Sequence, residues 1–189
     1  MDIPWGIMIP EYDQLPGGNR NWLTFQHWVD ISNANTGVTW TAIEAPLIEI
    51  GKMSANLPGG AHGSQNWYKT LSNSQTLFSW ALNNHWGTNF PLQQGGVIDL
   101  HYAILPHKGY DAAVAQRFGM EENRPLLAVP VAEKPVVNSW VKISTPGVMV
   151  SMLKQSDDGK GMILRLRSVS DKAEKVKLNW TNGIPHKLY

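Results

Sequence analysis

The densest group of polar and aromatic side chains lies in residues 83–90, which read Asn-Asn-His-Trp-Gly-Thr-Asn-Phe and are followed by Gln93-Gln94-Gly95-Gly96. Asn and Gln amides both donate and accept hydrogen bonds, as sugar hydroxyls do. The indole of Trp86 offers an apolar face that matches the apolar face of a pyranose. An Asx-rich connection whose amides satisfy its own backbone has the same composition. Carbohydrate binding and a structural connection therefore explain this pattern equally well when it is taken alone.

The histidines are the first candidates for metal ligands. A zinc site needs three or four converging ligands with ordered partners behind them. Asp99 and His101 are expected on one face of a strand, with His107 close behind, but no two histidines are spaced i, i+2 or i, i+4. The six are His27, His62, His85, His101, His107 and His186. We therefore expect no metal site within this chain.

The carboxylates do not form a recognisable catalytic pair either. A glycosidase needs two carboxyl groups about 5–9.5 Å apart. Glu121-Glu122 follow an expected helix and Asp157-Asp158 fall in an expected turn, so we expect both to be solvated. Glu11, Asp13 and Asp30 lie in an irregular stretch and could line a site, although the pattern does not select them. There is no nucleophile elbow, phosphate-binding loop or dinucleotide fingerprint, and no residue is predicted to be catalytic.

The elements that would position these residues are mainly strands. Residues 1–36 are expected to be irregular because Pro and Gly interrupt them, and the pattern over 22–30 fits a short helix or a strand. A long loop is expected over 54–74 and the one helix over 108–120, with Gly119 near its end. Alternating apolar residues predict strands at 38–43, 46–50, 75–83, 97–105, 126–131, 140–144, 148–154, 162–168 and 175–180.

The links between the last four strands favour an antiparallel meander. They contain Pro146-Gly147, Asp157-Asp158-Gly159 and Ser170-Asp171, which are residues typical of turns. Short strands with frequent turns are typical of a sandwich. We therefore predict an all-β protein with one short helix, folded as an antiparallel β-sandwich in a single domain over residues 1–189.

Composition excludes several classes of partner. The net charge is +1 and no basic run occurs, so a nucleic acid partner is not expected. There is no apolar stretch long enough to span a membrane, and the first residues lack the features of a signal peptide. The absence of cysteine rules out disulfides and thiolate metal sites and leaves the redox compartment open. Nine tryptophans are many for this length, and most are expected in the core or at a domain interface.

Residues 77–90 resemble a stretch in the C-terminal β-domain of family 38 glycoside hydrolases, the α-mannosidases. In that family a strand reading roughly aromatic-Ser-aromatic runs into Asn-Asn-aromatic-Trp-x-Thr-Asn-aromatic. Weaker likenesses extend the resemblance from Asp2 to about Leu178; they are Asp2–Gly6, Trp28–Ser32, Gln94-Gly95 with the strand 98–104, and Gly161–Leu166.

The resemblance implies a parent enzyme that is a retaining, zinc-dependent, exo-acting α-mannosidase. In such enzymes an N-terminal α/β barrel holds the Asp nucleophile and most zinc ligands, a three-helix segment follows, and β-sandwich domains of galactose-mutarotase-like supersandwich type close the chain. This chain matches only the last part. No catalytic residue, metal ligand or cofactor is carried over, and zinc is expected in the parent's catalytic domain.

What the resemblance carries over is the motif itself, namely Asn83, Asn84, Trp86, Thr88 and Asn89. We expect these residues to shape the interface with the catalytic domain and to reach the edge of its carbohydrate cleft, while His85 packs. On this reading the chain alone is inactive, and its partners are the catalytic domain and a mannose-containing glycan. A stand-alone carbohydrate-binding module and a complete small hydrolase are the alternatives. The compartment stays open, since periplasmic, other extracytoplasmic and cytoplasmic parents all fit.

Overall fold

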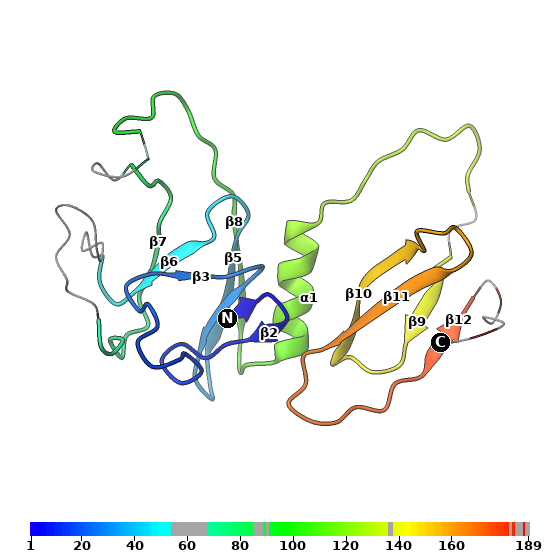
Figure 1. The fold of residues 1–189 in the computed structure, drawn as a ribbon, viewed down its shortest axis with the longest axis horizontal. Coiled ribbons are helices and arrows are strands. Elements are labelled where there is room, and N and C mark those ends of the chain that lie inside the picture. The colour runs from blue at the N-terminus through cyan, green and yellow to red at the C-terminus, as the bar shows by residue number, and fades with distance from the viewer. Residues whose placement is uncertain are drawn as a thin grey trace. The chain divides into compact units, whose positions relative to one another are not determined.

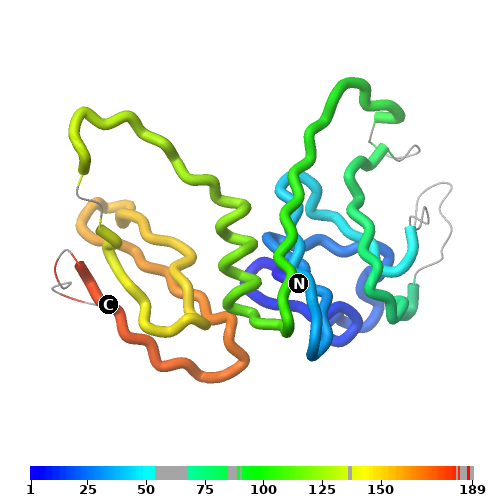
Figure 2. Tube along the Cα trace, turned by 180° about the vertical axis from the view of Figure 1, so that it is seen from behind, coloured from blue at the N-terminus to red at the C-terminus, as the bar shows by residue number. Residues whose placement is uncertain are grey.

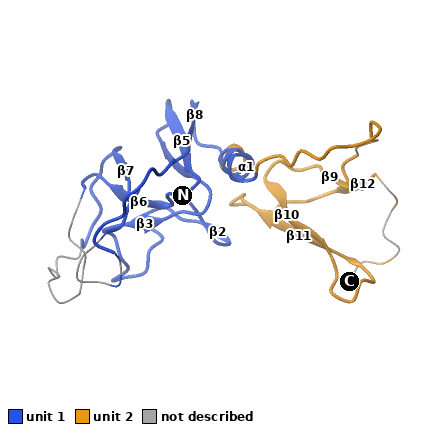
Figure 3. Cartoon of the chain, turned by 90° about the horizontal axis from the view of Figure 1, so that it is seen from above, with its two compact units in different colours: residues 1–111, 115–124 blue, residues 112–114, 125–189 orange. Residues whose placement is uncertain are grey.

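The computed structural model describes residues 1–53, 68–84, 89, 91–135, 138–181, 183 and 187. The protein is mainly β with one short helix, and every strand pair in the described residues is antiparallel, as the sequence predicts (Figure 1). Two compact units divide the chain (Figure 3). Unit 1 contains residues 1–111 and 115–124, and unit 2 contains residues 112–114 and 125–189. The prediction of a single domain stays a prediction.

The first 36 residues are more regular than expected, because they contain four short strands. Strand β1 (Asp2–Ile3) pairs with β2 (Gly6–Ile7). Strand β3 (Leu23–Thr24) is followed by β4 (Val29–Ser32), so the ambiguous stretch over 22–30 contains strand and no helix. Prolines and glycines still separate these strands, which accounts for their shortness.

Two three-stranded sheets form the body of unit 1. One has the order β3-β6-β7, in which β6 is Leu47–Ile50 and β7 is Leu77–Ser79. The other has the order β4-β5-β8, in which β5 is Gly37–Ala42 and β8 is Tyr102–His107. Successive strand residues face opposite sides of a sheet. The register pairs Trp40 with Ile104 and Thr39 with Leu105, so β5 turns Trp40 to one face and Thr39 to the other.

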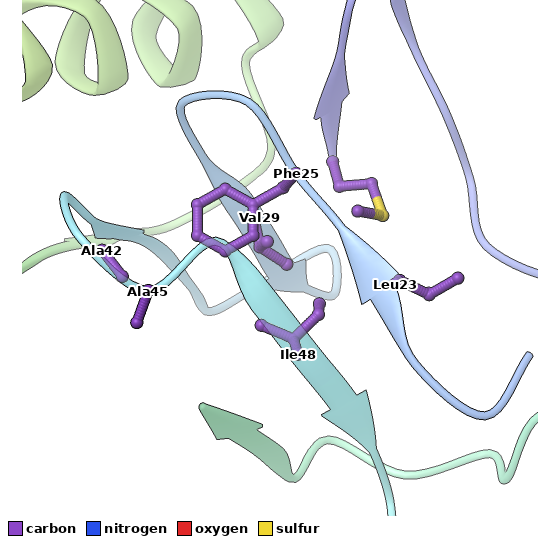
Figure 4. Close-up of a cluster of buried hydrophobic side chains, with 7 residues drawn as sticks. Leu23, Phe25, Val29, Ala42, Ala45 and Ile48 are labelled. Atoms are coloured by element: carbon purple, nitrogen blue, oxygen red, sulfur yellow. The ribbon is translucent and has the colours of Figure 1, made fainter. Parts of the chain in front are cut away.

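The core of unit 1 gathers side chains from β3 to β6 (Figure 4). Phe25 and Ile48 are almost fully buried, and Trp40, Ile50, Leu77 and Leu100 are among the partly buried residues packed against the cluster. Its buried members are Met1, Leu23, Phe25, Val29, Ala42, Ala45 and Ile48. Burial of this apolar surface is what holds the two sheets together.

The helix α1 (Ala112–Asn123) begins and ends later than expected. Asp111 precedes it, and its carbonyl oxygen accepts the first helical hydrogen bond from the Ala115 amide at 2.9 Å, as an N-cap residue does. Gly119 is buried inside the helix and does not end it, which corrects the expectation. A Cβ at Gly119 would lie 2.8 Å from Trp28 Cδ1, so only a residue without a side chain allows this approach.

Unit 2 contains two antiparallel strand pairs. Strand β10 (Val148–Gln155) pairs with β11 (Met162–Ser168), and β9 (Val141–Ile143) pairs with β12 (Leu178–Trp180). The expected meander over the last four strands is therefore wrong, because β9 bonds to β12 and not to its neighbour β10. The turn at Asp157-Asp158-Gly159 is confirmed, with Gly159 at a φ of 72°.

Three other expected strands differ from the structure. The strand expected over 75–83 is only β7, at 77–79, and the strand expected over 97–105 is β8, at 102–107. Figure 2 shows the stretch before β8 running extended into the strand. No strand forms over 126–131, because none of the described strands pairs with this segment. An alternating or apolar pattern predicts a strand only where a partner strand supplies the hydrogen bonds.

Candidate functional site

The polar-aromatic motif begins at Asn83, shortly after the end of β7 at Ser79, and the structure describes three of its five candidate residues. Asn84 donates from Nδ2 to the Pro91 carbonyl at 3.1 Å. The Oδ1 atom of Asn83 is buried and has no hydrogen-bond partner among the described residues. Asn89 is exposed in a turn. Trp86 and Thr88 lie outside the described residues, and so does His85.

A groove of about 550 Å³ lies next to β7 on the Trp40 face of the β4-β5-β8 sheet. Its walls come from the β4–β5 hairpin, from residues 75–79 and from Tyr102 of β8. Three chain segments that are distant in sequence therefore form one concave surface within unit 1. The same strand β7 borders the groove and leads into the motif, so the groove and Asn83 are connected by a short piece of chain.

The aromatic wall of the groove is built from stacked rings. The rings of Trp40 and Tyr102 lie nearly parallel, with centroids 5.6 Å apart and an interplanar angle of 17°. Phe25 packs on Trp40, with the two ring centroids 5.3 Å apart, and this contact anchors the stacked pair in the core. The Tyr102 hydroxyl shares a hydrogen bond of 2.9 Å with Ser79 Oγ. Tyr102 is still 43% exposed, so it presents a fixed ring to solvent.

The polar groups of the groove are neutral. Asn33 Oδ1 accepts hydrogen bonds from the backbone amides of Asn35 (2.8 Å) and Thr36 (2.9 Å), and these bonds hold the β4–β5 turn in shape. Gln75 also lines the groove and is exposed. Among the described residues that line the groove, none carries a formal charge.

Asp30 is the centre of a buried network on the other face of the same sheet. Its carboxylate accepts hydrogen bonds from Ser32 Oγ (2.5 Å), Thr39 Oγ1 (2.7 Å) and His107 Nε2 (2.7 Å). The side chains of Asp30 and His107 are only 6% and 15% exposed. Ser32 also borders the groove, so the network fixes one edge of it. Of the three acidic residues that the sequence left open, Asp30 is the one that is hydrogen-bonded to a groove residue, Ser32.

The other two acidic candidates hold loops. Glu11 Oε2 accepts from Arg20 Nε at 3.1 Å and from the Leu71 amide at 2.7 Å. Asp13 Oδ2 accepts from the Ile9 amide at 2.6 Å. In the turn before β11, Ser156 and the Lys160 amide hydrogen-bond to Asp158 and lower its pKa below the usual value. These bonds give each of the three carboxylates a local structural role.

The described histidines pair with three different carboxylates. His27 Nδ1 donates to Asp2 at 2.6 Å, His107 to Asp30, and His101 Nδ1 to Glu44 at 2.8 Å. The bonds from the His101 backbone and ring lower the pKa of Glu44. The idea that Asp99 and His101 share a strand face is wrong, because β8 begins at Tyr102. Within the described ranges, no three His, Cys, Asp or Glu residues come close enough to hold a metal ion.

The sequence did not point to the groove residues. Alternation predicts which residues of each expected strand share a face, but not that Trp40 and Tyr102 lie on the same face of one sheet. What was missing was the pairing of β5 with β8 and the position of β7, which no local pattern contains. The signal in the sequence that bears on it is an aromatic residue on each of two expected strands, Trp40 in 38–43 and Tyr102 in 97–105.

No helix of the described residues has the length and apolar character needed to cross a membrane. The chain matches no protein-family model, no curated protein and no solved structure.

Proposed function

We propose that this chain is a non-catalytic β-sandwich domain of an α-mannosidase-like glycoside hydrolase, and that it packs on a catalytic domain that contains the nucleophile, the acid/base and zinc. Two features support this. Residues 77–90 resemble the family's C-terminal β-domain, and the chain is all-β with one short helix, as that resemblance implies. The parent enzyme would hydrolyse α-mannosidic bonds in glycans.

The observation that carries the docking proposal is an exposed apolar segment in unit 2. Leu126 is 100% exposed, Leu127 91%, Val129 72% and Val131 59%. Isolated exposed apolar residues are ordinary, but a contiguous run of this kind marks an interaction surface. We call residues 126–131 the apolar segment. If the catalytic domain packs on the apolar segment, these side chains are removed from water, which stabilises the complex.

The motif is proposed to border that interface or the carbohydrate cleft. In the full-length enzyme, Trp86→Ala should lower turnover, thermal stability or both. If both quantities stay unchanged, the role assigned to the motif loses its support.

Docking is tested by mixing the chain with a family 38 catalytic domain from the same organism. We expect a stable complex in size-exclusion chromatography with light scattering. The double variant Leu126→Asp/Leu127→Asp should weaken the complex at least tenfold, because two buried leucines contribute more than 1.4 kcal/mol together. Leu15→Asp is the matched control, since Leu15 is 81% exposed in unit 1. Equal loss with both variants, or no complex at all, would contradict docking through the apolar segment.

The non-catalytic assignment has its own test. The purified chain is incubated with a chromogenic α-mannoside and zinc, and we expect no turnover above the buffer rate. Robust turnover would overturn the assignment in favour of a complete small hydrolase.

A further inference from the structure

We propose that the groove between β5, β7 and β8 is a binding site for one neutral hexopyranose unit, with Tyr102 as the stacking platform. The groove lies in unit 1 and the apolar segment in unit 2. Sugar binding and docking can therefore be measured, and can fail, separately.

First, the Tyr102 ring is exposed to solvent and is held in place by its neighbours. Tyr102 is 43% exposed, and the ring of Trp40 stacks on it with a centroid distance of 5.6 Å. The hydrogen bond to Ser79 restrains the ring from the side of β7. A ring that is already held in place loses little conformational freedom when a ligand stacks on it. Such a surface suits the apolar C–H face of a pyranose.

The second step is the set of polar groups around the platform. The Oδ1 atom of Asn33 is used by the β4–β5 turn, which orients the side chain and leaves its NH₂ group with no bond to a described residue. Gln75 forms no side-chain hydrogen bond with any described residue, so both ends of its amide are available. Amides that donate and accept match the vicinal hydroxyls of a sugar.

The third step is the charge and size of the site. The described residues that line the groove are all neutral, so nothing there would compensate the desolvation of a charged ligand. The volume of about 550 Å³ falls within the range of small-molecule sites. The combination of an aromatic platform and neutral hydrogen-bonding groups selects a neutral polar ligand with one apolar face. A hexopyranose has this chemistry.

The test is a titration of the 189-residue chain with methyl α-D-mannopyranoside and with an α-linked mannotriose. NMR chemical-shift changes are followed at the Tyr102, Gln75 and Asn33 signals. We expect saturable shifts at these three residues. Tyr102→Ala should weaken binding about tenfold, and Gln75→Ala about fivefold, because each removes one stacking or hydrogen-bonding contact.

Matched variants separate a binding effect from a folding effect. Tyr102→Phe keeps the ring and should retain most of the affinity. Tyr12→Ala removes a tyrosine that is 84% exposed away from the groove and should leave the affinity unchanged. Gln75 is exposed, so its replacement tests the site even if Tyr102→Ala lowers stability.

Two results would overturn the assignment. One is the absence of saturable shifts with either sugar. The other is binding that Tyr102→Ala and Gln75→Ala both leave intact, which would place the sugar on another aromatic surface. If the chain still docks on the catalytic domain while sugar binding is absent, the groove assignment fails and the docking proposal stands.

Discussion

At the scale of single residues, the buried carboxylate of Asp30 shows how polar groups shape the sheet next to the groove. Three donors converge on it, from Ser32, Thr39 and His107. A buried charge is tolerated only when such bonds replace the water it has lost. Its removal leaves the Thr39 hydroxyl and the His107 ring, which are buried or nearly so, without this acceptor, which costs more than the bonds themselves contribute.

The replacement Asp30→Ala should therefore destabilise the protein by roughly 3 kcal/mol, as loss of one partner of a buried pair does. Urea denaturation followed by circular dichroism measures this. Asp157→Ala is the control, because Asp157 is 92% exposed and its ion pair with Lys154, at 3.0 Å, lies at the surface. The control should change stability by less than about 0.5 kcal/mol. Equal effects of the two variants would contradict the network's role.

Tyr110 gives the chain a predictable response to high pH. Burial, together with the smaller effect of the negative charges of Asp30, Asp111 and Asp2, raises the pKa of Tyr110 to about 12. In the unfolded chain tyrosine loses its proton near its usual pKa of about 10. The unfolded state therefore binds fewer protons than the folded state between pH 10 and 12, and stability falls as the pH rises through this window.

Absorbance at 295 nm should show one tyrosine that ionises later than the others, and Tyr110→Phe should remove that late phase. The variant should also lose part of the stability decline between about pH 10 and 12. Identical titration of the remaining tyrosines in both proteins serves as the internal control. A wild-type curve without a late phase would contradict the assignment.

At the scale of elements, the helix α1 is positioned by close contacts with the residue that precedes β4 and with β5. Gly119 lies against Trp28, which is fully buried and donates from Nε1 to Gln116 at 3.3 Å. Asn123 adds a bond of 2.9 Å from Nδ2 to Thr41 Oγ1 of β5. The helix thus packs within unit 1 through residues that its weak amphipathic pattern does not reveal.

Gly119→Ala should destabilise the protein by about 1–3 kcal/mol, although alanine is the better helix former by about 1 kcal/mol. The reason is the Cβ that would lie 2.8 Å from Trp28 and 2.9 Å from the His27 carbonyl oxygen. In Gly109→Ala the nearest atom is 3.9 Å away, so this control should have little effect. Thermal melts of both variants measure the difference. A stabilised Gly119→Ala would contradict the close contact.

The same comparison shows how far the sequence predicts elements. Strand β5 was found with nearly correct bounds because its residues alternate strictly between two faces. Gly119 was misread as a helix end because a buried contact, invisible in sequence, favours glycine there. The pairing of β9 with β12 was missed because it depends on residues far apart in the chain, whereas turn signals describe only neighbours.

At the scale of the whole molecule, the fold class was predictable and the candidate site was not. The all-β class follows from many short alternating segments, each of which is a local signal. The groove requires Trp40, Ser79 and Tyr102 to meet, and their meeting depends on sheet order. The motif at 83–90 was conspicuous in sequence for its composition, yet only Asn83, Asn84 and Asn89 of its candidate residues are described.

The apolar segment also decides how the isolated chain should behave in solution. Four large apolar side chains there are 59–100% exposed, and the net charge of +1 provides little repulsion between copies. We expect self-association whose extent rises with protein concentration. Ammonium sulfate should strengthen it, because excluded salts favour burial of apolar surface, whereas association through charges would weaken with salt.

Sedimentation velocity over a range of concentrations measures this association, and a hydrophobic dye reports the exposed surface. Leu126→Asp/Leu127→Asp should stay monomeric and bind less dye, because the substitution places two charges in the surface that would be buried. Leu15→Asp should associate like the unchanged chain, since Leu15 is an exposed residue of unit 1 that lies outside the apolar segment. A chain that stays monomeric at every concentration and salt level, with no dye signal, would mean that the apolar segment is covered by the chain itself. The docking proposal would then lose the surface on which it depends.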